Sequence, residues 1–358
     1  MGQYVEAHKS ADASWRRRTG MMTGSRQLAI SLLLLVQVAT PLVAAGQAPD
    51  PLTTWTEGGA RDVIVQFVSR VTNPDAADYV PPEERIAVFD NDGTLWSERP
   101  WIEGLFWQKL LRDAAEADPA LNDVQPFKAA LEFDEDYFEN GGYRQAGPHV
   151  RDYVATLERE NFDNKVVAFF RARRHPDLGV PLSETVYRPA LELLDYLRAN
   201  DFRVFICSGG GADFIRVIAR DFYGIERHRV IGTSFTKSLQ FVEGRAVLRM
   251  TGELNTFNNR DEKAVNIDLH IGQRPLLVMG NAGGAGDIGM LSYSQGRAGP
   301  SLQLLIEHDD AEREYAYAED DNASLSAAKT NGWTVVSVKD DWSTVYGQPV
   351  DRRQRSDR

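Results

Sequence analysis

The sequence predicts a doubly wound α/β core, a parallel sheet with helices on both faces, interrupted by an all-helical insert. Apolar runs that end at Asp90, Cys207 and Met279 alternate with segments of helical periodicity, which is typical of parallel strands connected by helices. Residues 96–181 differ, because their apolar residues recur only at helical spacing and no strand is expected among them. We therefore assign residues 49–95 and 182–345 to the core and residues 96–181 to a helical insert after the first strand.

The expected elements follow from the same periodicities. Core helices are predicted over 60–71, 212–223, 261–270 and 288–293, with another inside 182–200, and the insert is expected to hold helices over 101–114 and 149–170. Strands are predicted over 85–89, 202–207, 230–233, 275–279, 302–306 and 333–338, with a hairpin over 239–250 that turns at 243–245. The charged end of the chain, residues 346–358, is predicted to be a disordered tail.

Composition and charge exclude several classes of protein. The chain has 358 residues, of which 42% are hydrophobic and 26% charged, as in ordinary globular proteins. The formal net charge is −12, so no nucleic acid is expected as a partner, because acidic surfaces repel phosphate backbones. The single cysteine, Cys207, allows no intramolecular disulfide. Its apolar neighbours favour a buried core residue over the alternative of a reactive thiol.

Residues 1–48 are predicted to be a signal peptide and leader. Arg26 precedes an apolar run over 28–45 that closes with small residues, as in secretory signal peptides. The alternative is an uncleaved membrane anchor, but Ser31, Gln37 and Pro41 interrupt the run. We expect a periplasmic or secreted bacterial protein, with no stable membrane insertion after the leader is removed.

Asp90 and Asp92 give the strongest chemical signal, in the segment Asp90-Asn-Asp-Gly-Thr at the end of the first strand. Ligands of open α/β sheets bind at this edge. A carboxylate can attack phosphorus to form an aspartyl-phosphate, and a second carboxylate two residues later can donate a proton to the leaving oxygen. The alternative is an ordinary acidic turn. The buried strand before the segment and the large insert after it favour the catalytic interpretation.

A second segment carries Ser208, Gly209 and Gly210 between a strand and a helix. Free backbone amides at the start of a helix bind phosphate oxygens, and a serine hydroxyl adds one more donor. A glycine-rich turn of this kind is a weak signal by itself. Its place downstream of Asp90 makes it a candidate phosphate site.

A cation and a glycine-rich loop complete the candidate site. Lys263 begins a later helix, and Arg260 is the other candidate cation. A lone lysine is usually solvated. Asn281 and Asp287 flank the glycine-rich loop that follows the next strand. Their side-chain oxygens suit a hard cation such as Mg²⁺.

Together and in this order, these segments resemble the motifs of the haloacid dehalogenase-like hydrolase superfamily. Much of residues 55–342 is similar to an exported, phosphatase-like bacterial branch of it. The resemblance implies a Mg²⁺-dependent phosphate-monoester hydrolase acting through an aspartyl-phosphate on a small phosphorylated substrate, with the insert as a cap. It assigns catalysis to Asp90, Asp92 and Lys263, substrate binding to Ser208, Gly209 and Gly210, and the metal to Asp90, Asp92, Asp287 and Asn281.

The loop from Asn281 to Asp287 departs from the family pattern. Relatives are expected to carry two acids close behind the asparagine, whereas this loop is longer and holds only Asp287. Weak binding of Mg²⁺ is therefore predicted, because affinity depends on ligand charge. Two alternatives stay open: a phosphotransferase of the same superfamily, and a non-catalytic protein that binds a phosphate ligand and has a degraded metal loop.

The insert offers further candidates for contact with a substrate. Trp96, Glu98, Trp101 and Phe106 follow the Asp90 turn and could face a pocket, although aromatic residues more often fill a core. The basic run over 171–175 could contact phosphate, but cations at a helix end also complement its exposed carbonyls. The second interpretation is favoured for the basic run.

Overall fold

The computed structural model describes residues 52–348. The predicted leader, residues 1–48, lies outside the described residues, as do residues 349–358 of the predicted tail, so export stays a prediction. Within residues 52–348, no helix combines the length and the apolar character needed to cross a bilayer.

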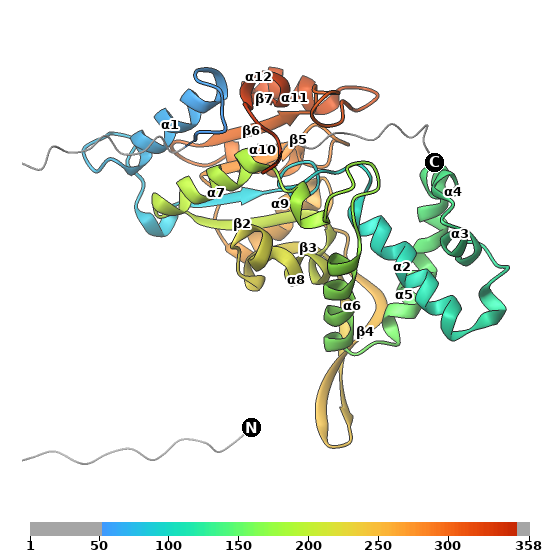
Figure 1. Ribbon diagram of the computed structural model, residues 1–358. Helices are drawn as coiled ribbons and strands as arrows, with labels where there is room; N and C mark the ends of the chain where they lie inside the picture. Colours follow the sequence, from blue (N-terminus) through green and yellow to red (C-terminus); the bar gives the residue numbers. More distant parts are fainter. Residues whose placement is uncertain (1–51, 349–358) are drawn as a thin grey trace, which may run out of the picture. The chain divides into compact units, whose positions relative to one another are not determined.

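A seven-stranded sheet ordered β4-β3-β2-β1-β5-β6-β7 forms the core (Figure 1). Its strands are β1 Ile86–Phe89, β2 Arg203–Gly211, β3 Val230–Val242, β4 Arg245–Thr256, β5 Leu277–Asn281, β6 Leu302–Glu307 and β7 Thr334–Ser337. All neighbouring pairs are parallel except β3 and β4. The predicted α/β fold is confirmed. Because β1 lies between β2 and β5, the strand order reverses there, and ligands bind at such a point.

The central strands of the sheet are buried on both faces, and this explains why the sequence of β1 is apolar throughout. Ala87 and Phe89 join a hydrophobic cluster with helices α1 (Gly59–Thr72), α7 (Arg188–Ala199) and α8 (Ala212–Tyr223). Ile86 and Val88 point to the opposite face, where they pack with α9 (Asp261–Ile271), α10 (Ile288–Gln295) and α11 (Ala323–Asn331). A short helix, α12 (Val338–Asp341), follows the last strand.

The insert between β1 and β2 is helical, as the sequence predicts. It contains α2 Ile102–Ala117, α3 Phe127–Glu132, α4 Glu135–Tyr137, α5 Tyr143–Ala155 and α6 Arg159–Ala172. The single helix expected over 149–170 is wrong in detail, because α5 ends at Ala155 and a new helix begins at Arg159. Residues between the two helices contact the sheet instead: the Thr156 carbonyl accepts a hydrogen bond of 3.0 Å from Arg249.

The β3–β4 hairpin is longer than the sequence predicts. The sequence favours a short strand over 230–233 and a separate hairpin over 239–250, but β3 runs without a break and pairs with β4 along most of its length. The chain turns at Glu243 and Gly244, both with positive φ. At Gly252 in β4, a Cβ atom would lie 3.4 Å from Ala155. The hairpin therefore packs against the helical insert.

The last part of the described chain differs from the sequence prediction in two places. Tyr346, which the sequence assigns to a disordered tail, is buried and stacks on Tyr187 with ring centroids 5.9 Å apart. Helix α11 is not predicted, because its small residues give a weak helical periodicity.

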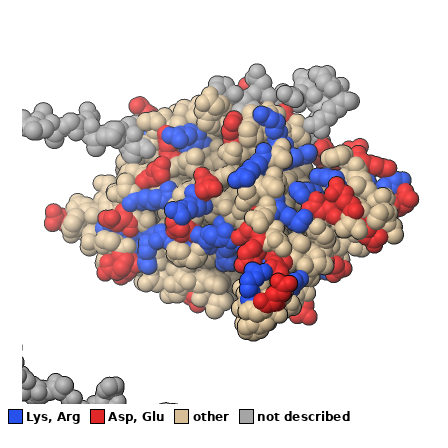
Figure 2. All heavy atoms as spheres, turned by 60° about the horizontal axis from the view of Figure 1, so that its bottom comes forward, with Lys and Arg blue, Asp and Glu red and all other residues tan. Residues whose placement is uncertain are grey.

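Figure 2 shows one face of the molecule, on which basic and acidic side chains are interspersed.

Candidate active site

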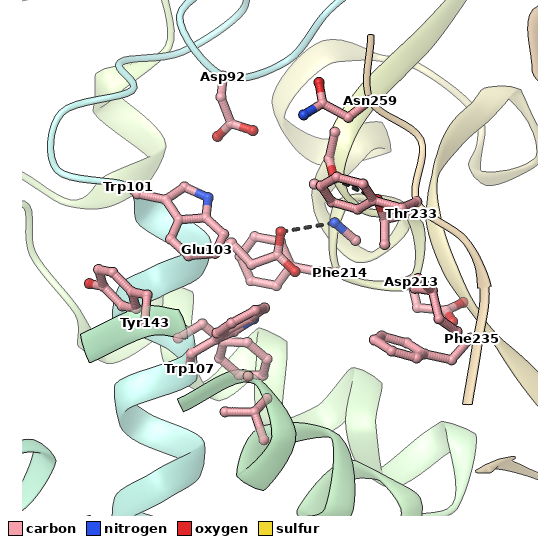
Figure 3. A pocket seen from close by; sticks show the side chains of 18 of the residues that line it. Asp92, Trp101, Glu103, Trp107, Tyr143, Asp213, Phe214, Thr233, Phe235 and Asn259 are labelled. Carbon is pink, nitrogen blue, oxygen red and sulfur yellow. Dashed lines mark hydrogen bonds between the residues drawn. The ribbon is translucent and has the colours of Figure 1, made fainter. Parts of the chain in front are cut away.

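A cavity of about 740 Å³ lies between the carboxyl edge of the sheet and the helical insert (Figure 3). The core contributes a polar wall to it, and the insert and the β3–β4 hairpin contribute mainly apolar and aromatic side chains. The candidate residues that line it are Asp90, Asp92, Gly209, Gly210, Lys263, Asn281 and Asp287. Since they come from the turn after β1, the ends of β2 and β5, the loop after β5 and helix α9, the parallel sheet brings together residues far apart in the sequence.

The turn after β1 holds Asp92 in a fixed position. The Asn91 carbonyl accepts the Leu95 amide at 2.8 Å, and Gly93 has a φ of 69°, a conformation that glycine adopts without strain. A Cβ atom at residue 93 would also collide with the Asn281 amide. The Trp96 indole N–H donates to Asp92 Oδ1 at 2.8 Å. Burial raises the pKa of Asp92, and the bond from Trp96 opposes that shift, so the carboxyl holds a proton at higher pH than a solvated aspartate.

Lys263 joins two of the candidate carboxylates. Its Nζ lies 2.6 Å from Asp90 Oδ1 and 2.5 Å from Asp287 Oδ1, and only 3% of its side chain is exposed. Burial and the charge of Asp287 raise the pKa of Asp90, while Lys263 opposes this shift. Burial lowers the pKa of Lys263, but the two carboxylates raise it by more, so the lysine stays charged. Arg260, the other candidate cation, is exposed.

Ser208 and its glycines differ from the prediction in one respect. The Ser208 hydroxyl is fully buried, and its Oγ accepts the Gly210 amide at 3.0 Å. The Gly210 N–H therefore points to Ser208 rather than into the cavity, contrary to the expected direct contact with phosphate. The next amide, at Gly211, donates to Glu103 Oε2 at 2.8 Å. Gly209 and Gly210 still line the cavity, where the absence of side chains gives a ligand close access to the backbone.

The longer loop after β5 still delivers Asp287 to the site. Asp287 is 2% exposed, and its Oδ2 accepts the Asn281 backbone amide at 2.9 Å. The intervening amides of Gly284 and Ala285 donate to Glu319 Oε1 at 3.2 and 2.6 Å. The extra residues are thus held by Glu319, while the acid that ends the loop faces Lys263.

The donor atoms fit a hard divalent cation in kind. Asp90 and Asp287 supply carboxylate oxygens, and backbone carbonyl and amide oxygens at Asp92 and Asn281 could add neutral ones. The Asn281 side-chain amide nitrogen donates to Glu98 Oε2 at 3.1 Å, which leaves the side-chain oxygen as the atom able to bind a cation. Among residues 52–348, no three His, Cys, Asp or Glu side chains form a group that could hold a metal ion.

Glu98 occupies the space beside Gly283, in the loop that lacks the second acid. A Cβ atom at Gly283 would lie 2.8 Å from Glu98 Oε2 and 2.6 Å from Asn281 Nδ2. Burial raises the pKa of Glu98, and the charge of Asp92 adds to this. The sequence placed Glu98 among residues that could face a pocket, and it does line the cavity.

His308, after β6, supports the Asp92 turn from behind, and sequence reasoning missed it. Its Nε2 lies 2.9 Å from the Gly93 carbonyl and its Nδ1 lies 2.8 Å from Glu314 Oε2. Both partners are acceptors, an arrangement that favours a ring protonated on both nitrogens. Burial lowers the pKa of His308, but Glu314 raises it by more. The Tyr317 ring stacks on His308 with centroids 4.3 Å apart.

The remaining sequence candidates divide between the cavity and the core. Trp101 and Phe106 line the cavity, whereas Trp96 is fully buried and packs on Phe170 and Phe214. The basic run over 171–175 lies at the end of α6 and is not among the described residues that line the cavity. Cys207 is buried, as expected, and burial raises the pKa of its thiol to about 12, so it is an inert core residue.

The fold and these residues define a hydrolase with a carboxylate-rich site at the switch point of its sheet. Residues 87–291 match the family of haloacid dehalogenase-like hydrolases, and the chain belongs to this family. No curated protein matches the sequence.

Several solved structures are similar to this chain. The chain is similar to a functionally unknown protein from Anaerococcus prevotii, at 14% identity and a TM-score of 0.50, with 79% of this chain and 94% of that one covered. A protein of unknown function from Bordetella pertussis is 17% identical with a TM-score of 0.46, covering 71% and 98%. A phosphoserine phosphohydrolase-like protein from Francisella tularensis is 15% identical with a TM-score of 0.36, covering 70% and 94%. At these identities the likeness concerns the fold alone.

Proposed function

We propose that this protein is a metal-dependent phosphate-monoester hydrolase that acts through an aspartyl-phosphate on Asp90. The observation that carries the proposal is the arrangement of Asp90, Asp92 and Lys263 along one cavity wall. The Asp90 carboxylate there pairs with the buried Lys263, whereas the Asp92 carboxyl group, two residues later, accepts the Trp96 indole N–H. Nucleophilic attack and proton transfer need two carboxyl groups in such different environments.

In the first step, an Asp90 carboxylate oxygen forms a bond to phosphorus while the bond from phosphorus to the ester oxygen breaks. Asp92, whose pKa is raised by burial, donates its proton to the departing oxygen, so the alcohol leaves neutral. The Trp96 indole engages Asp92 Oδ1, which directs the other carboxyl oxygen to this task. Lys263 stabilises the negative charge that gathers on the phosphoryl oxygens.

In the second step, water attacks phosphorus and the Asp92 carboxylate takes its proton. The bond between phosphorus and the Asp90 oxygen then breaks, which releases inorganic phosphate and restores both carboxyl groups. Asp90, Asp287, Asn281 and the Asp92 carbonyl would hold Mg²⁺, whose charge would favour the ionised forms of Asp90 and Asp287 and offset that of the phosphate. The cover that the insert provides excludes bulk water from the cavity.

The proposal is tested by assaying release of phosphate from a panel of phosphate monoesters, with and without Mg²⁺. We expect turnover that requires the metal and is lost in Asp90→Asn, an almost isosteric change that removes the nucleophile. Phosphate transfer to an added alcohol in preference to water would identify a phosphotransferase instead. Absence of turnover with every ester, in a folded protein that binds Mg²⁺, would overturn the proposed activity.

A further inference from the structure

One part of the cavity combines a buried carboxylate with three aromatic rings. Glu103 and Trp107 lie in the first two turns of α2, Trp101 precedes that helix and Tyr143 begins α5. The Trp101 ring meets the rings of Trp107 and Tyr143 edge-on, with centroids 5.0 and 5.1 Å apart. Figure 3 shows these three rings grouped beside the Glu103 side chain. We call this group of four residues the aromatic recess.

The sequence makes room for the recess at Gly104. A Cβ atom at this position would lie 2.6 Å from the Trp101 ring and 2.7 Å from the Tyr143 ring. Both distances are below contact, so a larger residue would push the two rings apart. A glycine inside a helix costs stability, and here it permits the close approach of the rings.

Within residues 52–348, no basic side chain forms an ion pair with Glu103. Its carboxylate is 8% exposed and accepts the Gly211 amide at 2.8 Å. Of the basic residues that line the cavity, Lys263 is held by Asp90 and Asp287, while Arg144 and Arg151 are exposed. Burial raises the pKa of Glu103 to about 7, and the charge of Asp92 adds to this shift. A buried carboxylate without a cation is unfavourable, so a ligand that brings one would gain from meeting it.

The surroundings of Glu103 select the kind of cation. Aromatic faces attract ammonium groups, and sets of aromatic rings recognise quaternary nitrogen. The next parts of the cavity wall, which include Phe106 and Phe214, are apolar and suit an alkyl chain rather than a hydrated metal ion. A positive nitrogen would also offset the repulsion between Glu103 and a phosphate group bound beside Asp90.

We infer that the aromatic recess binds a cationic nitrogen on the leaving group, so that the substrates are phosphate monoesters of amino or quaternary ammonium alcohols. This inference rests on the proposed phosphatase function and adds its substrate class. The chemistry is that of the two steps above: the bond from phosphorus to the ester oxygen breaks, and the alcohol leaves with the proton from Asp92. The recess holds the nitrogen throughout and takes no part in bond making.

The test compares choline phosphate with 3,3-dimethylbutyl phosphate, in which a carbon atom replaces the charged nitrogen. We expect kcat/KM to be at least about tenfold higher for choline phosphate, since a desolvated cation on aromatic rings gains on this order. Glu103→Gln and Trp101→Leu should each bring the ratio of the two kcat/KM values close to one. Glu116→Gln, an exposed position in the same helix, is the matched control and should keep the ratio.

A second measurement does not depend on turnover. Choline should quench the tryptophan fluorescence of the protein at concentrations where 3,3-dimethylbutanol does not, and Glu103→Gln should remove this quenching. Equal kcat/KM for the two esters would overturn the substrate class and leave the phosphatase function standing. No turnover with any ester, together with quenching specific to choline, would overturn the phosphatase function and support the recess. Failure of choline to quench would overturn the recess.

Discussion

The carboxyl group of Glu103 should make the protein less stable as the pH rises, and Glu103→Gln should remove this part of the pH dependence. Burial raises the pKa of this group from 4.5 in its unperturbed state to about 7. A carboxyl group with a raised pKa in the folded state stabilises the fold fully below its unfolded pKa, and that contribution is lost as the pH rises through the folded value. The difference between 7 and 4.5 corresponds to about 3 kcal/mol in the free energy of unfolding.

The measurement is urea unfolding of the wild type and of Glu103→Gln at a series of pH values between about 5 and 8.5. Other titrating groups are shared by the two proteins and cancel in the difference. The wild type should lose most of the 3 kcal/mol relative to the variant across this range, and Glu116→Gln should follow the wild type. The argument would be refuted if the free energies of unfolding of the wild type and Glu103→Gln changed with pH by the same amount, because Glu103 would then titrate as it does in water.

Two further predictions concern the polar wall of the cavity. Lys263→Met should reduce the free energy of unfolding near neutral pH by about 3–5 kcal/mol, because it leaves the buried Asp90 and Asp287 carboxylates without their cation; a loss below about 1 kcal/mol in urea unfolding would contradict the buried bridge. Gly283→Asp should not lower the Mg²⁺ concentration needed for half-maximal activity, since its new carboxylate would meet Glu98. Metal titration of activity checks this, and a clear decrease would show that residue 283 faces the metal instead.

Much of the core could be predicted from the sequence because parallel strands buried on both faces are apolar throughout. The run before Asp90 and the run that ends at Met279 are apolar in this way. Once such strands are recognised, the residues after them must meet at one edge of the sheet, which is why the sequence alone groups Asp90 and Asp287. Lys263 begins a helix, and only its order in the family pattern placed it with them.

Other parts of the site carry no local signal. Glu103 and His308 are a single acid in an amphipathic helix and a single histidine after a strand, and only tertiary packing places them against Gly211 and Gly93. The bond between the Gly210 amide and Ser208 depends on the local backbone conformation and on the Ser208 rotamer, which a glycine-rich pattern does not specify. The length of the hairpin was missed because half-exposed paired strands alternate less regularly than buried ones.

The claim that Asp90 carries the phosphoryl group is tested most directly by trapping the intermediate. The protein would be mixed with a turned-over ester and Mg²⁺, quenched in acid during turnover, and digested for peptide mass spectrometry. The account predicts a phosphoryl group on the peptide that contains Asp90, removed by hydroxylamine as expected of an acyl phosphate and absent in Asp90→Asn. Full turnover by Asp90→Asn, or a phosphoryl group attached to another residue, would contradict it.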